Sequence, residues 1–343
     1  MTKQVVAVLG GTGQQGGGVV DALLGAGKFA VRVASRNPAS DAARALAVRG
    51  VEVVRADLLD PSSLRSALAG AHGAFVVTNF WDPAQMSRET EIGRAAVQAA
   101  RAAGVEHLIW STLPDSEKLT GERLKVVHFT GKARVDAAVK AAGFARHTFV
   151  MAPMYYQNLL TMMAPQTLPN GGRGWAAPID PGARVMHAGD ATEVGRVVAA
   201  AFAAGAKLPD GSYLAPCGGI YSFNDFVDTL NKQGHKLQVV QVPPAVYDGF
   251  YPGASEVREM FQYFCGEYLL RPRARAVHRR GQCPRPGRIH ELRRLGACAH
   301  EGGLTHSAQQ KSSAALSRSG EDREVSRQTS AMGQSRHGDA ACP

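Results

Sequence analysis

Residues 5–16 read Val-Val-Ala-Val-Leu-Gly-Gly-Thr-Gly-Gln-Gln-Gly. The apolar run predicts a buried strand, and the glycines predict a tight turn that leads into a helix. Gly10 would permit the turn, Gly13 would let backbone approach a pyrophosphate, and Gly16 would let the helix pack close to the strand. The free N–H groups at the start of that helix favour anions. Because a strand precedes the glycines and a helix follows them, the pattern predicts a dinucleotide-binding turn rather than a glycine-rich turn without a ligand. The residues expected there are Gly10, Thr12, Gly13, Gln14, Gln15 and Gly16.

Short apolar runs and helical segments alternate through the first 150 residues. Continuous apolar strands separated by helices are typical of a parallel sheet that is covered on both faces. We therefore predict an α/β fold, in which residues 1–150 form a Rossmann-type doubly wound parallel sheet. The apolar runs lie at residues 5–9, 30–34, 51–54, 74–77, 108–111 and 147–151, and the helices at 16–25, 41–48, 62–68, 86–103 and 123–142.

The pattern changes after Met151. Residues 164–184 are rich in proline and glycine, which predicts a loop over the site. Residues 183–205 are expected to return to the first domain, and the rest of 151–268 to form a smaller C-terminal α/β lobe for a substrate or partner. Within that lobe, Ser222 is a predicted helix cap.

The positive charge of the chain is concentrated near its C-terminus. Residues 269–343 hold 14 Lys plus Arg against 6 Asp plus Glu, and no Phe, Tyr or Trp, so they predict an atypical basic, disordered tail. One interpretation is a natural arm that binds an acidic partner. The other, which we favour, is a frameshift after about residue 268, because the shifted frame can encode an amphipathic, aromatic helix. The remaining chain is nearly neutral, which argues against direct binding to nucleic acid.

A cation follows the second apolar run, where NAD-binding folds normally carry an acid. Arg36 can pair with the 2′-phosphate of NADP in a forked, charge-assisted contact, and Ser35 and Asn37 can add neutral hydrogen bonds. The alternative is a solvated surface arginine. The pattern thus favours NADP(H) over NAD(H).

Polar residues also follow the third and fourth strands. Asp57, followed by Leu58, is expected either to accept a hydrogen bond from the adenine amino group or to form a turn before Pro61. Thr78 and Asn79 lie beside the expected cofactor path, although both could be ordinary turn residues. No metal-ligand spacing is present among the cysteines.

These residues, in this order, resemble the NmrA-like family of atypical short-chain dehydrogenases/reductases, which includes fungal nitrogen-metabolite regulators and a human NADPH-sensing protein. The resemblance spans about residues 4–264, and it implies a Rossmann-type fold and NADP(H) binding. The matching segments are 10–16, 35–38, 77–81, 128–132, 155–159, 250–254 and 260–264.

The chain departs from conventional members at the catalytic pair, Tyr-x-x-x-Lys. His128 and Lys132 stand at the positions that look equivalent. Lys132 can still bind the nicotinamide ribose, the alternative being a surface lysine of a basic helix. His128 is either a group that titrates near neutral pH or a merely packed side chain. Tyr155 and Asn158, with Tyr156, are expected to flank the nicotinamide pocket, where either tyrosine could replace the missing acid. The alternative is that the tyrosines only pack beneath the second lobe. The methionines at 151, 154, 162 and 163 would supply either pliable apolar lining or core filling.

Two functions fit these residues. The first is an NADPH-dependent oxidoreductase that transfers hydride to a small carbonyl, quinone or enone. The second is a non-catalytic redox sensor whose NADP(H) occupancy changes its affinity for a regulatory protein partner. The chain has no apolar run long enough to span a membrane and enters a strand without a signal-peptide pattern, so we expect a cytoplasmic protein.

Overall fold

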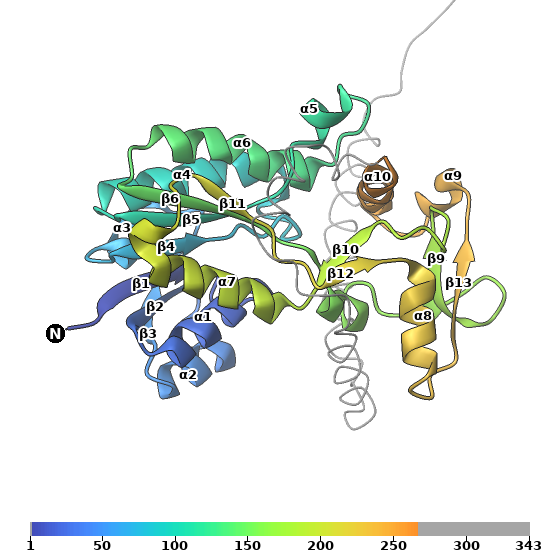
Figure 1. Ribbon diagram of the computed structural model, residues 1–343, viewed down its shortest axis with the longest axis horizontal. Helices are drawn as coiled ribbons and strands as arrows, with labels where there is room; N and C mark the ends of the chain where they lie inside the picture. The colour runs from blue at the N-terminus through green and yellow to red at the C-terminus, as the bar shows by residue number, and fades with distance from the viewer. Residues whose placement is uncertain (1, 267–343) are drawn as a thin grey trace, which may run out of the picture. The chain divides into compact units, whose positions relative to one another are not determined.

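The computed structural model describes residues 2–266, so the predictions for the basic tail lie outside the described residues. A seven-stranded sheet with the order β11-β6-β5-β4-β1-β2-β3 forms the larger part (Figure 1). All its neighbouring strands pair in parallel, which confirms the predicted doubly wound α/β fold. The strands are β1 (Gln4–Leu9), β2 (Phe29–Ser35), β3 (Glu52–Arg55), β4 (Gly73–Val76), β5 (His107–Thr112), β6 (Arg146–Met151) and β11 (Ser212–Leu214).

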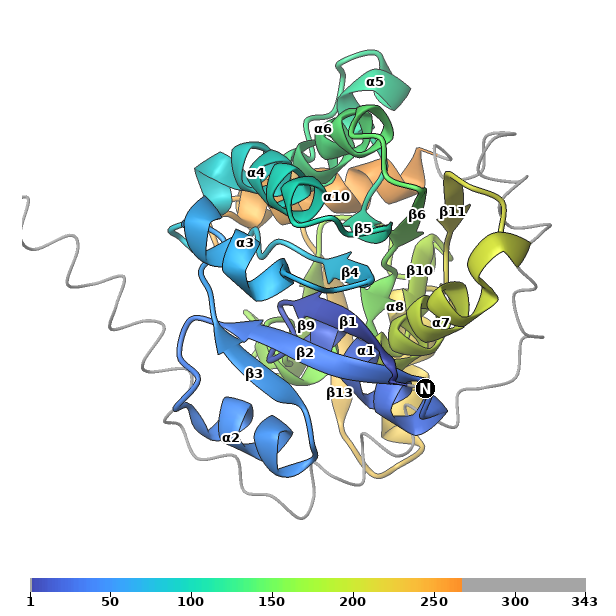
Figure 2. The same ribbon diagram turned by 90° about the vertical axis from the view of Figure 1, so that its left-hand side faces the viewer.

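Helices cover both faces of this sheet (Figure 2). On one face, α3 (Pro61–Leu68), α4 (Glu89–Ala102) and α6 (Val127–Ala141) enclose a core around Trp110 and Phe149. On the other, α1 (Gln14–Ala26) and α7 (Ala191–Ala204) pack closely together over Val8 and Phe75, and α2 (Asp41–Val48) adds Leu46. The central strands β1 and β4 are largely buried on both faces, which explains why their sequences are almost continuously apolar.

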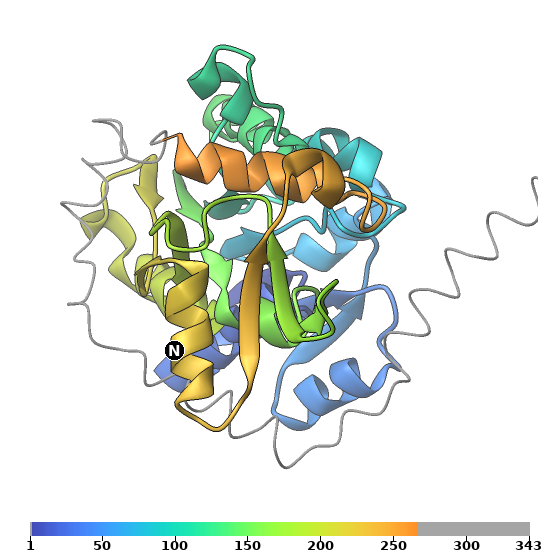
Figure 3. The ribbon, with the colours of Figure 1, turned by 90° about the vertical axis from the view of Figure 1, so that its right-hand side faces the viewer.

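A smaller part, which we call the small lobe, contains two three-stranded sheets and a core of its own. Figure 3 shows helix α10 (Ala254–Cys265, orange) crossing this part beside the sheet that contains β9 (Arg173–Ala177) and β13 (Leu237–Gln241). One sheet has the order β12-β10-β7 and the other β13-β9-β8. The elements are β7 (Met154–Tyr155), β8 (Gln166–Thr167), β9 (Arg173–Ala177), β10 (Met186–Gly189), β12 (Gly219–Tyr221), α8 (Phe223–Asn231), β13 (Leu237–Gln241), α9 (Pro244–Tyr247) and α10 (Ala254–Cys265).

The region after Met151 differs from the expectation in two respects. The segment 164–184 is not one loop, because β8 and β9 pair within it and β9 also pairs with β13. The stretch that returns to the large sheet is α7 and β11, whereas β10 pairs with β7 and β12. Local signals were more reliable: Ser222 caps α8 as predicted, in a reciprocal capping box with Asp225.

The remaining short helices join these elements. They are η1 (Met86–Arg88), which leads directly into α4, α5 (Ser116–Thr120), η2 (Tyr156–Leu160) and η3 (Gly205–Lys207). None of the helices within residues 2–266 is long and apolar enough to cross a membrane.

Candidate functional site

A cavity of about 1360 Å³ lies where the carboxyl ends of the parallel strands meet the small lobe. This is the edge at which open α/β sheets bind ligands. Most of the predicted cofactor and catalytic residues line it, and two, Asn37 and Tyr156, do not. The lining includes Gly10, Thr12, Gly13, Gln14, Gln15, Gly16, Ser35, Arg36, Asp57, Leu58, Thr78, Asn79, His128, Lys132, Tyr155 and Asn158.

Asn37, the first of these two, does not line the cavity. Its side-chain oxygen accepts a hydrogen bond from the Ala39 N–H, at 3.0 Å, and so shapes the turn before α2. Ser35 is buried, and its hydroxyl accepts from the Asn37 N–H, at 3.2 Å. The Asp57 carboxylate likewise stabilises the turn after β3, where it accepts a hydrogen bond from the Leu59 N–H at 3.0 Å. Asp57 also lies on the cavity wall.

The glycine turn has the geometry that its sequence predicts. Gly10 has a φ of 85°, in the left-handed region, and its carbonyl accepts from the Gly13 N–H at 3.0 Å. A Cβ at position 16 would lie 2.2 Å from the Gly10 carbonyl oxygen, so only glycine allows this approach of helix and strand. Helix α1 begins after Gly13 with no side-chain cap and no acid in its first turn. The N-terminal end of α1 therefore presents uncapped N–H groups to the cavity, as anion binding requires.

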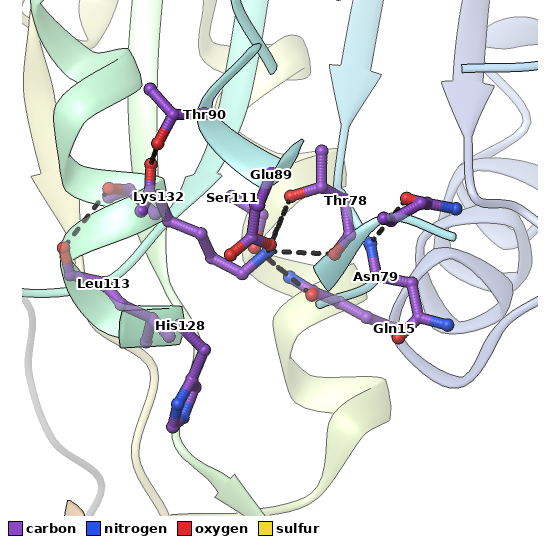
Figure 4. A network of polar contacts seen from close by, with 12 residues as sticks. Gln15, Thr78, Asn79, Glu89, Thr90, Ser111, Leu113, His128 and Lys132 are labelled. Carbon is purple, nitrogen blue, oxygen red and sulfur yellow. Dashed lines mark hydrogen bonds and ion pairs between the residues drawn. The ribbon is translucent and has the colours of Figure 1, made fainter. Parts of the chain in front are cut away.

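Gln15 connects the glycine turn to the end of β5. Its amide nitrogen donates to the Ser111 hydroxyl at 2.9 Å, and both side chains are buried (Figure 4). Ser111, near the end of this strand, lines the cavity. The neighbouring Thr112 does not line it, because its hydroxyl donates to Asp136 at 2.7 Å.

Lys132 is buried beside Glu89 and Thr78 (Figure 4). Its Nζ donates to Glu89 Oε1 at 2.6 Å, to Thr78 Oγ1 at 2.7 Å and to the Thr78 carbonyl at 2.8 Å. Burial lowers the pKa of Lys132, and the charge and hydrogen bond of Glu89 oppose that shift. Three acceptors thus hold the ammonium group in the cavity wall, which is a strong constraint on a side chain that is normally mobile.

The sequence prediction missed Glu89. Its side chain is 3% exposed, and its second oxygen, Oε2, is buried without a hydrogen-bond partner among the described residues. The available signal was its position, since Glu89 lies on the same face of α4 as Ile92, Gly93 and Ala96, which are buried. A carboxylate on a buried helix face requires a charged partner.

His128 pairs with Glu256 of α10, a second residue that the sequence prediction missed. Glu256 Oε1 lies 2.5 Å from His128 Nδ1 and also accepts from the His128 backbone N–H at 3.0 Å. Burial acts to raise the pKa of Glu256, but the hydrogen bonds from His128 outweigh it and the pKa is lowered. Among the residues that the structure describes, none forms a hydrogen bond with His128 Nε2. The ring packs against Phe80 and Trp81 at centroid distances of 5.4 and 5.3 Å.

The two tyrosines expected beside the nicotinamide differ in position. Tyr155 lines the cavity, and burial raises the pKa of its phenol. Tyr156 lies instead in the core of the small lobe, where its hydroxyl donates to Tyr221 at 3.0 Å. All four predicted methionines, Met151, Met154, Met162 and Met163, line the cavity. Within residues 2–266, no cluster of three His, Cys, Asp or Glu side chains could hold a metal ion.

Comparisons with known proteins agree with this fold. The model of the NmrA-like family matches residues 2–271. A curated relative, the NmrA-like family domain-containing oxidoreductase himF of Aspergillus japonicus, is 35% identical over 160 residues, which is 46% of this chain and 48% of the relative. Other curated relatives match similarly, so the chain spans about half the length of the curated relatives it matches.

Solved structures show the same fold. A crystal structure of NmrA, described as a negative transcriptional regulator in complex with NAD, is 25% identical with a TM-score of 0.64, over 79% of this chain and 83% of the other. The NADPH-dependent quinone oxidoreductase QOR2 of Escherichia coli, in complex with NADPH, is 20% identical with a TM-score of 0.62, over 77% and 90%. At 20% identity, the similarity to QOR2 concerns the fold alone.

Proposed function

The chain belongs to the NmrA-like family, and from that premise we propose that it binds NADP(H) in the cavity and reduces a small carbonyl, quinone or enone. One observation supports this most: the uncapped start of α1, the cation Arg36 and the buried Lys132 all border one cavity. These features fit a dinucleotide, because anionic groups can meet free N–H groups and a guanidinium at the cavity wall.

Each end of the cofactor has residues that suit it. The residues 10–16 would hold the pyrophosphate, and Arg36 with Ser35 would hold the 2′-phosphate. Asp57 and Leu58 line the wall on the adenine side, while Thr78, Asn79, Lys132, Tyr155 and Asn158 would border the ribose and nicotinamide. The 25% identical NmrA structure contains NAD, which supports the same use of this chain's cavity.

The reaction needs a proton as well as a hydride. Bound NADPH supplies the hydride, and His128 is the group we assign to donate the proton to the substrate oxygen. Glu256 holds Nδ1, which leaves Nε2 at the cavity as the proton-carrying nitrogen and stabilises the ring when it is charged. Tyr155 keeps its proton because its pKa is raised, so it acts as a hydrogen-bond donor rather than as an acid.

Consumption of NADPH with a panel of quinones, aldehydes and enones tests the enzymatic proposal. We expect turnover in the unmodified chain and loss of turnover in Lys132→Met/Glu89→Gln, which removes both charges of the buried pair. Lys140→Met is the matched control, because Lys140 belongs to the same helix, is exposed and does not line the cavity. If no substrate in the panel consumes NADPH above background, the reductase proposal is wrong.

A regulatory role is the second candidate. It is favoured by the replacement of the expected tyrosine by His128 and by the likeness to a structure described as a negative transcriptional regulator. A sensor requires that a protein partner bind with different affinity when the cofactor is present. Partner binding that is the same with and without NADPH would exclude this role.

A further inference from the structure

Arg36 forms an ion pair with an acid that the sequence prediction did not consider. Its Nη1 lies 2.9 Å from Oδ2 of Asp82, in the segment between β4 and η1. The Arg36 side chain is 60% exposed, whereas that of Asp82 is only 15% exposed. The guanidinium assigned to the 2′-phosphate therefore has a neighbouring carboxylate before any cofactor binds.

Asp82 is held in place by its own segment and does not depend on Arg36. Its Oδ1 accepts from the Ala84 N–H at 3.1 Å, and its Oδ2 accepts from the Gln85 side chain at 3.3 Å. Gln85 is buried, and it also accepts from the Asn79 N–H at 3.4 Å. A cofactor that engages Arg36 would thus meet a carboxylate that cannot easily move away.

We propose that Asp82 sets the cofactor preference by opposing the 2′-phosphate at Arg36, so that the chain discriminates only modestly between NADP(H) and NAD(H). This inference rests on the proposed cofactor site. A phosphate bound to Arg36 would place about two negative charges near the Asp82 carboxylate, which contacts the same guanidinium. Like charges that share one cation in this way repel each other even near the protein surface. The ribose hydroxyl of NAD(H) carries no charge and meets no such repulsion.

The test compares affinities for NADP⁺ and NAD⁺ in the full chain and in Asp82→Asn. The substitution removes the charge and keeps the size and shape of the side chain. The single oxygen of asparagine can replace either Oδ2, which accepts from Arg36 and Gln85, or Oδ1, which accepts from Ala84, but not both. We expect the affinity for NADP⁺ to rise about threefold to tenfold, from the size of exposed charge interactions, while that for NAD⁺ stays within about twofold. The gain should shrink as salt is added.

Two further measurements make the result specific. Asp21→Asn removes one charge from the exposed Asp21–Arg49 pair, which does not line the cavity, and it should leave the ratio of the two affinities unchanged. Adenosine 2′,5′-bisphosphate, which lacks the nicotinamide, should show the same gain as NADP⁺. An unchanged ratio, or weaker NADP⁺ binding in Asp82→Asn, would overturn the inference. If neither dinucleotide binds the unmodified chain, the proposed cofactor site is what fails.

Discussion

Lys132 illustrates how one side chain depends on residues that are distant in sequence. Thr78, in the segment after β4, and Glu89, the first residue of α4, hold the ammonium group from α6. Removing one member of a buried ion pair leaves the other charge without compensation, which costs far more than the pair contributes when intact.

Glu89→Gln should therefore destabilise the fold by about 3–5 kcal/mol, measured by urea unfolding at pH 7. The loss should diminish as the pH rises towards about 10.4, the ordinary pKa of lysine. At that pH the lysine of the unfolded chain also loses its proton, so unfolding no longer gains from charging Lys132. Lys132→Met/Glu89→Gln should recover much of the stability, since neither charge remains. Equal stability of Glu89→Gln and the unmodified chain would contradict the buried pair.

The residues predicted from sequence are those whose role depends on local order along the chain. Gly10 and Arg36 follow strands directly, and Gly16 lies in the first turn of the helix after β1, so their places at the sheet edge could be predicted. Glu89, Asp82 and Glu256 could not, because each acts on a residue from a different element. Such partners are fixed only when the elements pack.

At the scale of elements, helices α1 and α7 approach so closely that Gly18 and Gly195 pack against the backbone of the opposite helix. A Cβ at Gly195 would lie 2.0 Å from the Gly18 carbonyl oxygen, which belongs to backbone and cannot rotate away. This contact fixes α1, and hence the anion-binding start of that helix, against the large sheet. The short strands β8 and β9 could not be predicted from the sequence, because the proline- and glycine-rich composition of residues 164–184 predicted a loop.

Gly195→Ala should lower the unfolding free energy by about 1–3 kcal/mol, because the helices must separate to fit the methyl group. The control is Gly25→Ala in α1, where nothing lies within 4 Å of the added carbon. Alanine there should stabilise the helix by about 0.5–1 kcal/mol. Thermal unfolding of both variants measures the contrast, and a neutral Gly195→Ala would mean that the helices are not in this contact.

At the scale of the whole molecule, two buried groups oppose each other in their response to pH. Burial lowers the pKa of His107 to about 4, so its contribution to stability is present above its usual pKa and is lost as the pH falls towards 4. Burial also raises the pKa of Asp136 to about 6, so stability is lost as the pH rises through 6. Each shift corresponds to about 3 kcal/mol, and the two nearly cancel between pH 4 and 6.

The substitution Asp136→Asn should expose the contribution of His107. Its unfolding free energy should fall more steeply than that of the unmodified chain as the pH drops from 6 to 4, whatever its stability at pH 7. His107→Gln should show the reverse slope. Urea unfolding at a series of pH values measures these slopes, and parallel curves for all three proteins would refute the assignment.

The parallel sheet and its binding edge could be predicted from the alternation of apolar runs and helices, because these are properties of short segments. The existence of a small lobe could also be predicted, but its strand pairing could not, since its sheets join strands that are distant in sequence, such as β9 with β13. The central claim is that these two parts enclose a site for NADP(H).

Isothermal titration of the full chain with NADPH and NADH, repeated with Arg36→Ala, tests that claim most directly. We predict one NADPH bound per chain, more tightly than NADH. Arg36→Ala should weaken NADPH binding about tenfold, the size of a charge-assisted contact, and leave NADH binding nearly unchanged. No binding of either nucleotide, or an NADPH affinity that is unaffected in Arg36→Ala, would contradict the account.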